Sequence, residues 1–339
     1  MSVAQLALDM PAHPFLDKYL LVLGEWLDDE AVTELLVNRP REVWVERNGK
    51  MARHGAPAID NSLLQRLAEQ VARITNQGIT RERPLLAATL PSGHRVQFVG
   101  PSATRAHWAM AIRRHRLVNL PLDAYDRGSL AGEVAEEIID PIDRPIEFLR
   151  AAVKKRQTIL ISGGTSTGKT TFLNALLREV PADERVIVVE DTPEIRLHAD
   201  NDLGLVAVKG ELGEAIVNMD DLLQAALRLR PDRILLGELR GKEAVSFLRA
   251  VNTGHPGSFT TIHANSPDGA LEQLALMVMQ SGLGLSRSDT ISYAKTVIDV
   301  IVQLGRRGSE RSIVTIKQLA EPGDACPPVH LAAKAVASP

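Results

Sequence analysis

The stretch Gly163-Gly164-Thr165-Ser166-Thr167-Gly168-Lys169-Thr170-Thr171 fits the pattern G-x-x-x-x-G-K-[ST] of a phosphate-binding loop. Glycines allow a turn so tight that successive backbone N–H groups point at phosphate oxygens. In such a loop the lysine places its charge on the β- and γ-phosphates, and the hydroxyl after it binds Mg²⁺. The stretch therefore predicts that residues 163–171 bind a nucleoside triphosphate, with Thr170 as a metal ligand.

The residues on either side of the loop support this interpretation over a glycine-rich turn with an incidental lysine. Thr158–Ser162 is a short apolar run rich in β-branched residues, which is typical of a buried strand. Thr171–Glu179 reads as a helix, whose N-terminal dipole would face the same anion. The order strand, loop, helix is the context that a phosphate-binding loop requires.

The bulk composition indicates a globular protein of about two domains. The chain has 339 residues, with 39 Lys and Arg against 42 Asp and Glu, so its net charge of −3 gives no general attraction to nucleic acid. Its one cysteine, Cys326, permits neither an internal disulfide nor a cysteine-rich zinc site. We find no signal-peptide pattern and no apolar run of about 18 residues, and expect a soluble or peripheral protein.

The sequence predicts two domains that differ in their order of helices and strands. Residues 1–120 read as an α+β domain with an antiparallel sheet, its helices at 15–28 and 60–76 and its strands at 33–37, 42–46, 85–90, 95–99 and 108–112. Residues 121–144 are interpreted as a linker and residues 326–339 as a loose tail. Between them, residues 145–325 alternate strands with helices, which predicts an α/β domain with a mostly parallel sheet.

Acidic residues follow two predicted strands of the second domain. Val186–Val189 leads into Glu190, Asp191 and Glu194, at the strand end that faces the ligand crevice in parallel sheets. We expect Glu190 to act on the metal and Glu194 to assist the attacking water, although a solvated strand end would show the same pattern. The run 233–237 ends in Glu238, which we expect to position or deprotonate that water.

Two histidines flank the predicted strand 257–262. His255 and His263 lie eight positions apart, and we expect both to sense the γ-phosphate. Their spacing and the lack of cysteines argue against zinc.

These residues together resemble the traffic ATPases of bacterial type IV secretion and conjugation, within the wider superfamily of secretion and pilus ATPases. The resemblance covers nearly the whole chain. It is carried by the phosphate loop, Glu-Asp-Thr-Pro-Glu at 190–194, Arg-Pro-Asp-Arg-Ile-Leu-Leu-Gly-Glu at 230–238, Thr-Gly-His-Pro-Gly at 253–257, Thr-Ile-His-Ala at 261–264, and the first-domain segments 87–97 and 111–114.

The resemblance implies a C-terminal RecA-like P-loop ATPase domain and a homohexameric ring that binds ATP and Mg²⁺ between the two domains of each subunit. It implies that Arg95 and Arg113 contact the phosphates. It also implies a cytoplasmic protein, peripheral at the inner membrane, whose partners are inner-membrane type IV secretion components and transported protein or DNA–protein substrates, without sequence-specific binding of nucleic acid. Type II secretion ATPases commonly carry a four-cysteine zinc module, which one cysteine cannot build.

Three alternatives stay open from the sequence. A pilus retraction ATPase or another secretion ATPase of the same superfamily would share the core motifs. A helicase-like motor would need a basic channel or stacking aromatics, whereas aromatic residues are only 4% of this chain. A scaffold that binds ATP without hydrolysing it would need none of the acidic residues at 190–194 and 238.

Overall fold

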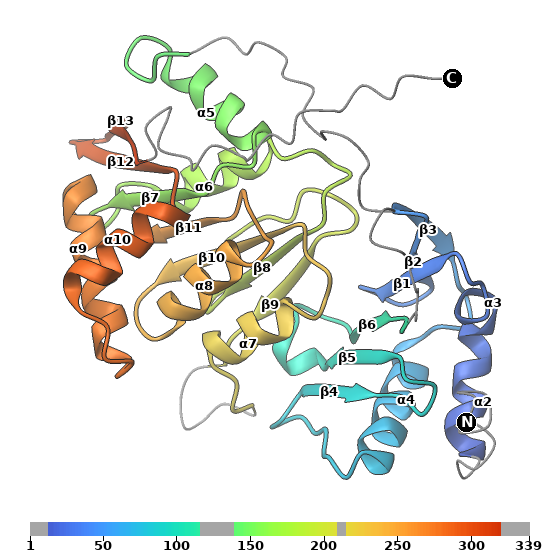
Figure 1. The fold of residues 1–339 in the computed structure, drawn as a ribbon. Helices are drawn as coiled ribbons and strands as arrows, with labels where there is room; N and C mark the ends of the chain where they lie inside the picture. Colours follow the sequence, from blue (N-terminus) through green and yellow to red (C-terminus); the bar gives the residue numbers. More distant parts are fainter. Residues whose placement is uncertain (1–12, 116–138, 209–214, 320–339) are drawn as a thin grey trace, which may run out of the picture.

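The structure is a computed structural model that describes residues 13–115, 139–208 and 215–319 (Figure 1). Most of the predicted linker 121–144 and all of the predicted tail 326–339 lie outside the described residues. The domain boundaries therefore stay a prediction. Among the helices of the described ranges, none combines the length and the apolar character that a membrane crossing needs.

The first domain is built on a six-stranded antiparallel sheet in the order β3-β2-β1-β6-β5-β4. Its strands are Val32–Val37 (β1), Glu42–Arg47 (β2), Lys50–Gly55 (β3), Leu85–Thr89 (β4), Arg95–Val99 (β5) and Ala109–Arg113 (β6). Its helices are Pro14–Leu20 (α2), the short 3-10 turn Leu21–Leu23 (η1), Gly24–Leu27 (α3), Asn61–Ile74 (α4) and the 3-10 turn Pro101–Ala103 (η2).

Helices cover one face of this sheet. Helix α4 begins where the Asp60 side chain accepts a hydrogen bond from the N–H of Leu63, as an N-cap residue does. Its apolar residues recur at helical spacing and pack with α2 and α3 on the side chains of Leu35, Phe98 and Ile112. The helices and the sheet thus enclose the core of the first domain.

The second domain is built on a seven-stranded sheet in the order β13-β12-β7-β11-β10-β8-β9. Its strands are Ile159–Gly163 (β7), Val186–Glu190 (β8), Leu203–Val206 (β9), Arg233–Leu239 (β10), Phe259–Ile262 (β11), Val300–Arg307 (β12) and Glu310–Gln318 (β13). Every neighbouring pair is parallel except β12 with β13, which form an antiparallel hairpin. The α/β fold with a mostly parallel sheet, preceded by an α+β domain, is confirmed.

Helices cover both faces of the second sheet (Figure 1). They are Pro145–Lys154 (α5), Lys169–Leu177 (α6), Met219–Ala226 (α7), Glu243–Asn252 (α8), Pro267–Gln280 (α9) and Arg287–Val297 (α10). Alternate residues of β8 point to opposite faces: Val186 and Val188 pack with α5 and α6, whereas Ile187 and Val189 pack with α7 to α10. Burial on both faces explains why these strands are continuous apolar runs.

The two domains share a continuous core. Leu36, Val99, Ala109 and Ala111 of the first sheet are buried in the same cluster as β8, α7 and α8 of the second domain. The face of the first sheet that α4 leaves uncovered is therefore closed by the second domain.

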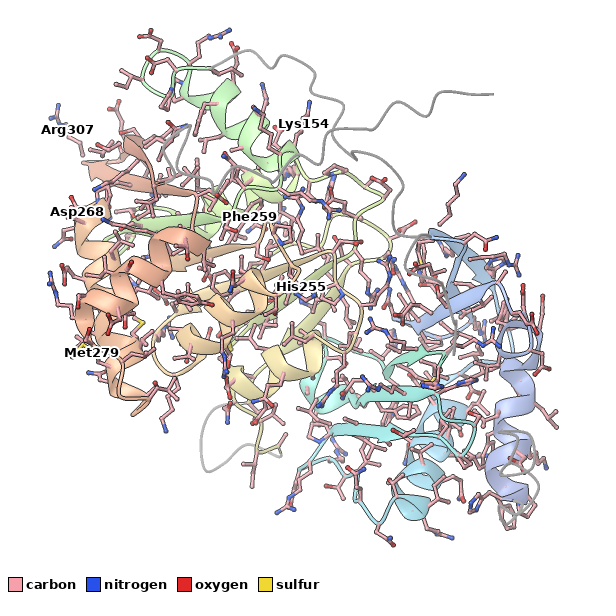
Figure 2. The ribbon with its side chains drawn as sticks, in the orientation of Figure 1. Lys154, His255, Phe259, Asp268, Met279 and Arg307 are labelled. Carbon is pink, nitrogen blue, oxygen red and sulfur yellow. The ribbon has the colours of Figure 1, made fainter. Side chains whose placement is uncertain are left out.

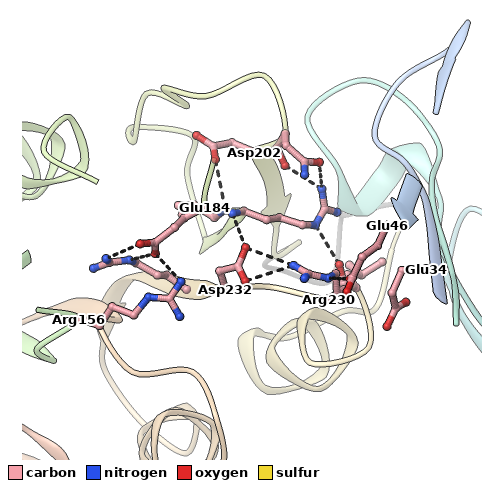
Figure 3. Close-up of polar contacts among 12 residues, drawn as sticks. Glu34, Glu46, Arg156, Glu184, Asp202, Arg230 and Asp232 are labelled. Atoms are coloured by element: carbon pink, nitrogen blue, oxygen red, sulfur yellow. Dashed lines mark hydrogen bonds and ion pairs between the residues drawn. The ribbon is translucent and has the colours of Figure 1, made fainter. Parts of the chain in front are cut away.

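Polar contacts also cross the domain boundary (Figure 3). The Nδ2 atom of Asn38 donates to Oδ1 of Asn201 at 2.9 Å, and Nε of Arg230 lies 2.5 Å from Oε2 of Glu46. Arg185 of the second domain is fully buried beside Asn201. Its guanidinium group donates to Leu229 O and to Asn201. Burial, together with the nearby charge of Arg230, lowers the pKa of Arg185 to about 10. The Asn38–Asn201 and Arg230–Glu46 contacts thus join the second domain to the first sheet in this arrangement.

Candidate active site

The phosphate-binding loop joins β7 to α6 at the edge where the parallel strands end. Ser166 and Gly168 adopt positive φ angles of 60° and 88°, which produce the tight turn. A Cβ atom at Gly163 would collide with Oγ1 of Thr167, so the glycine is required for the close approach of the chain. The loop therefore has the local geometry that its sequence predicts.

A cavity of about 530 Å³ opens over this loop. Its lining comes from the loop and from the ends of three further strands. The residues are Thr165 to Thr171; Glu190 at the end of β8 with Asp191, Thr192, Glu194 and Ile195 after it; Gly237 and Glu238 of β10 with Arg240 after it; and Thr261 of β11 with His263 after it. Residues from four neighbouring strand ends thus meet in one place, as ligand sites in parallel sheets do.

Lys169 points back along the loop. Its Nζ atom donates to the carbonyl oxygens of Gly163 at 3.1 Å and Gly164 at 3.4 Å. Burial lowers the pKa of the Lys169 ammonium group, and the charge of Glu238 offsets part of this effect. A partly desolvated ammonium group in a cavity interacts strongly with an anion that enters it.

Glu238 lies at the centre of a charged cluster in this cavity. Its Oε1 atom is 2.6 Å from Nε2 of His263 and 4.0 Å from Nζ of Lys169. Its Oε2 atom accepts from Arg240 at 2.5 Å, and Arg240 also reaches Oδ2 of Asp191 at 2.7 Å. The carboxylate is therefore poised beside the loop with one oxygen turned toward Lys169 and His263.

Glu190 and Glu194 have different surroundings. Glu190 is almost fully buried, and its Oε2 atom accepts from the N–H groups of Glu194 at 2.9 Å and Ile195 at 3.0 Å. Its Oε1 atom accepts from Arg105 of the first domain. A metal ion would have to displace these partners, so the arrangement favours a structural role for Glu190 over the predicted metal binding. Glu194 is exposed and lines the cavity.

Arg95 and Arg113 lie away from this cavity. They lie opposite each other in the register of β5 and β6. Together with Arg228 of the second domain, they line a second cavity of about 640 Å³. The two cavities share no lining residue. Arg113 Nε donates to Glu34 Oε1 at 2.5 Å. The structure thus brings the two arginines together, but it does not bring them to the phosphate-binding loop.

His255 also lies outside the cavity over the loop. His255 precedes β11 and His263 follows it, so the two histidines lie at opposite ends of this strand. The ring of His255, which is labelled in Figure 2, forms a hydrogen bond with the carbonyl oxygen of Ala250 at the end of α8. His255 therefore lies away from the phosphate-binding loop, and its contact with the nucleotide stays a prediction.

Three residues of the site were missed by sequence reasoning. Arg105 contacts Glu190 from a loop that carries no motif. Asn174 donates to Thr170 O at 3.0 Å and to Glu194 O at 3.2 Å, and so ties α6 to the acidic segment. Thr261 donates to Gly237 O at 2.8 Å. The position of Asn174, one helical turn after Thr170, was the only signal that the sequence offered.

The residues present fit a magnesium nucleotide only in part. Thr170 lines the cavity directly after Lys169 and can offer a hydroxyl to a metal held by phosphates. In the described part of the chain, no cluster of three or more His, Cys, Asp or Glu side chains is arranged to hold a metal by itself. A metal would therefore enter with the phosphates rather than occupy a site built by the protein alone.

Comparison with known proteins places the chain in a family. The family model described as "Type II/IV secretion system protein" matches residues 22–318. The chain is 39% identical over 318 residues to the type IV secretion system protein PtlH homolog of Bordetella bronchiseptica, covering 88% of this chain and 94% of that one. It is 36% identical over 310 residues to VirB11 of Bartonella quintana, covering 84% and 87%.

A solved structure agrees with these relatives. The crystal structure of the VirB11 ATPase from the Brucella suis type IV secretion system, in complex with sulphate, superposes with a TM-score of 0.80 at 33% identity, covering 90% of this chain and 94% of that chain. The chain therefore belongs to the type II/IV secretion system protein family of ATPases. Within that family it is homologous to the VirB11 and PtlH proteins of type IV secretion.

Proposed function

We propose that the chain is an ATP-hydrolysing motor that works as a homohexamer in a bacterial type IV secretion or conjugation system. The observation that carries the proposal is the convergence of Lys169, Glu238 and His263 over a phosphate-binding loop, in one cavity at the strand ends. Homology to VirB11 and PtlH proteins supports the type of machine that the motor would serve.

The loop and Lys169 bind the triphosphate in this proposal. Lys169 now donates to two carbonyl oxygens of its own loop, and phosphate oxygens would replace these acceptors with charged ones. Mg²⁺ would neutralise charge on the phosphates, with Thr170 as its protein ligand.

Glu238 positions the attacking water and accepts its proton. Its Oε2 atom is held by Arg240, which leaves Oε1 toward Lys169 and His263. Glu194, which also lines the cavity, assists. His263, which lies within hydrogen-bond distance of both Lys169 and Glu238, reports occupancy of the γ-phosphate position.

Arg95 and Arg113 act on the phosphates only after a movement in this proposal. They are attached to the first domain and line a separate cavity, so a rigid-body swing of that domain would have to bring them to the nucleotide. The same swing would transmit the state of the nucleotide through the ring to substrates or pilus subunits. The chain would act in the cytoplasm at the inner membrane, with inner-membrane secretion components as partners.

Phosphate release and particle mass test this proposal together. Purified protein is assayed with Mg·ATP, with and without DNA, while light scattering gives the mass, and Lys169→Ala is the control. The proposal expects a particle of six subunits with turnover that depends on Lys169 and not on DNA. Turnover strongly stimulated by DNA would point to a helicase-like motor, and a ring without turnover would point to a scaffold.

A further inference from the structure

Arg105 of the first domain reaches the acidic segment 190–195, which lines the nucleotide cavity. One of its Nη atoms donates both to Oε1 of Glu190 and, at 2.6 Å, to the carbonyl oxygen of Ile195. Arg105 keeps only a quarter of its side-chain surface exposed, and the Glu190 side chain keeps 2%. The contact is therefore a nearly buried ion pair between the two domains.

Glu190 transmits this contact to the segment that lines the cavity. While its Oε1 atom pairs with Arg105, its Oε2 atom accepts the N–H groups of Glu194 and Ile195. The segment 190–195 thus folds around one carboxylate, and Asp191 and Glu194 lie on its cavity side. Without Arg105, the buried Glu190 carboxylate would lose the charged partner that compensates its burial, which is a costly state.

The second domain leaves a slot for this arginine. Thr104 forms an antiparallel bridge with Leu205 of β9, which places Arg105 opposite Gly204. A Cβ atom at Gly204 would lie 2.7 Å from Cδ of Arg105 and closer still to Nε. Gly204 is not among the glycines with positive φ angles, so the backbone there accepts alanine, and an added Cβ would have to push the Arg105 side chain aside.

We propose that Arg105 is a positioning residue for ATP hydrolysis: it enters through the slot at Gly204, pairs with Glu190 and so holds the segment 190–195 in its working shape against the nucleotide cavity. This inference rests on the proposed ATPase function. Because Arg105 belongs to the first domain, any swing of that domain that breaks the pair would release the segment, so the swing proposed for Arg95 and Arg113 must keep Arg105 paired with Glu190. The position of the first domain would thereby control the shape of the segment 190–195.

The first test measures the segment itself and needs no turnover. Hydrogen exchange of the amides of residues 191–197 is followed in the full-length protein for Arg105→Gln and for Gly204→Ala. Both changes are expected to accelerate exchange there, because the acceptor of the Glu194 and Ile195 amides is loosened. Unchanged exchange in both variants would overturn the proposal.

A matched control lies on the same domain boundary. Arg53 of β3 pairs across it with Asp200 at 3.3 Å, is half exposed and touches no residue of the cavity. Arg53→Ala removes an ion pair between the domains without reaching segment 190–195, so its exchange there should match that of the wild type. Acceleration by Arg53→Ala equal to that by Arg105→Gln would show a general loosening and would contradict a specific role of Arg105.

The second test separates turnover from binding. Arg105→Gln and Gly204→Ala should each lower kcat by about tenfold to a hundredfold, as misplaced catalytic groups do, while the affinity for a fluorescent ATP analogue stays close to that of the wild type. Arg105→Lys should restore part of kcat, because it keeps the charge. If Arg105 acts through Glu190, the double variant Arg105→Gln with Glu190→Gln should be no slower than the slower single variant.

The outcomes distinguish this inference from the proposed function. A wild type that releases no phosphate would contradict the proposed function, and the exchange experiment would still decide the role of Arg105. A wild type that turns over while Arg105→Gln keeps its full kcat, or additive losses in the double variant, would overturn the role of Arg105 alone.

Discussion

The Nε2 atom of His263 lies 2.6 Å from Oε1 of Glu238, although the two residues belong to the ends of different strands. The His263 side chain is half exposed, whereas only 13% of the Glu238 side-chain surface is exposed. Lys169 lies 3.3 Å from the same imidazole ring. The histidine therefore connects the lysine of the phosphate-binding loop with the carboxylate that we assign to water activation.

Replacing His263 by alanine should lower kcat by about tenfold, because Glu238 would lose one of the groups that orient it. Binding of ATP should change little, since the loop and Lys169 stay in place. His263→Gln should retain more activity than His263→Ala, because its amide nitrogen can still approach Oε1 of Glu238. Steady-state kcat and KM measure both variants, and a His263→Ala enzyme with the wild-type kcat would exclude this role.

Arg233, the first residue of β10, forms a buried ion pair with Glu184. It is fully buried, and its Nε atom lies 2.6 Å from Oε2 of Glu184. Although burial acts to raise the pKa of Glu184, its bond to Arg233 and the charges of Arg233 and Arg156 keep that pKa below its ordinary value. Arg233→Ala would leave Glu184 without its buried partner and should cost about 3–5 kcal/mol in the free energy of unfolding.

Arg156 is the matched control for this prediction (Figure 3). It contacts the same carboxylate at 3.3 Å, but it is 41% exposed. Arg156→Ala should therefore cost less than about 1 kcal/mol. Urea unfolding of both variants measures the difference, and equal losses would refute the assigned importance of burial.

Asp299 predicts a dependence of stability on pH. Burial raises the pKa of this carboxyl above its ordinary value of 3.8, and a hydrogen bond from the N–H of Thr158 at 2.7 Å offsets part of the effect. The folded chain therefore binds the proton more tightly than the unfolded chain. Stability from this group is fully present below pH 3.8 and is lost as the pH rises through the raised pKa.

Asparagine at position 299 would remove this loss and keep an oxygen that can accept from Thr158. Asp299→Asn should therefore become more stable relative to the wild type as the pH rises, by about 1.4 kcal/mol for each unit by which folding raises the pKa. Urea midpoints at pH 4.5 and 7.5 measure the change. A stability difference that stays constant between these pH values would show that Asp299 titrates as it does in the unfolded chain.

The fold was predictable where apolar patterns were strong. The runs at 186–190 and 233–239 are buried on both faces, and the sequence located both strands. Strand β3 was missed because Lys50–Gly55 is polar and mostly exposed, and β9 because it has four residues including Gly204. The predicted helix at 15–28 is divided into α2, a 3-10 turn and α3, with Leu16, Leu23 and Trp26 buried in the core of the first domain.

The site was predictable within the second domain and less so across the domains. A phosphate-binding loop and strand ends of one parallel sheet must meet, so Lys169, Glu194, Glu238 and His263 were expected together and line one cavity. The placement of Arg95 and Arg113 depends on how the domains dock, which local patterns do not encode. Arg105 was missed for the same reason, because it acquires its partner only through docking.

The most direct test of ATP hydrolysis in this cavity compares ATP binding and phosphate release between the wild type and Glu238→Gln. The substitution keeps the size of the side chain and removes the base beside Lys169. The variant should bind a fluorescent ATP analogue as tightly as the wild type and release phosphate at least about a hundredfold more slowly. Release at the wild-type rate would contradict the claim that this cavity hydrolyses ATP through Glu238.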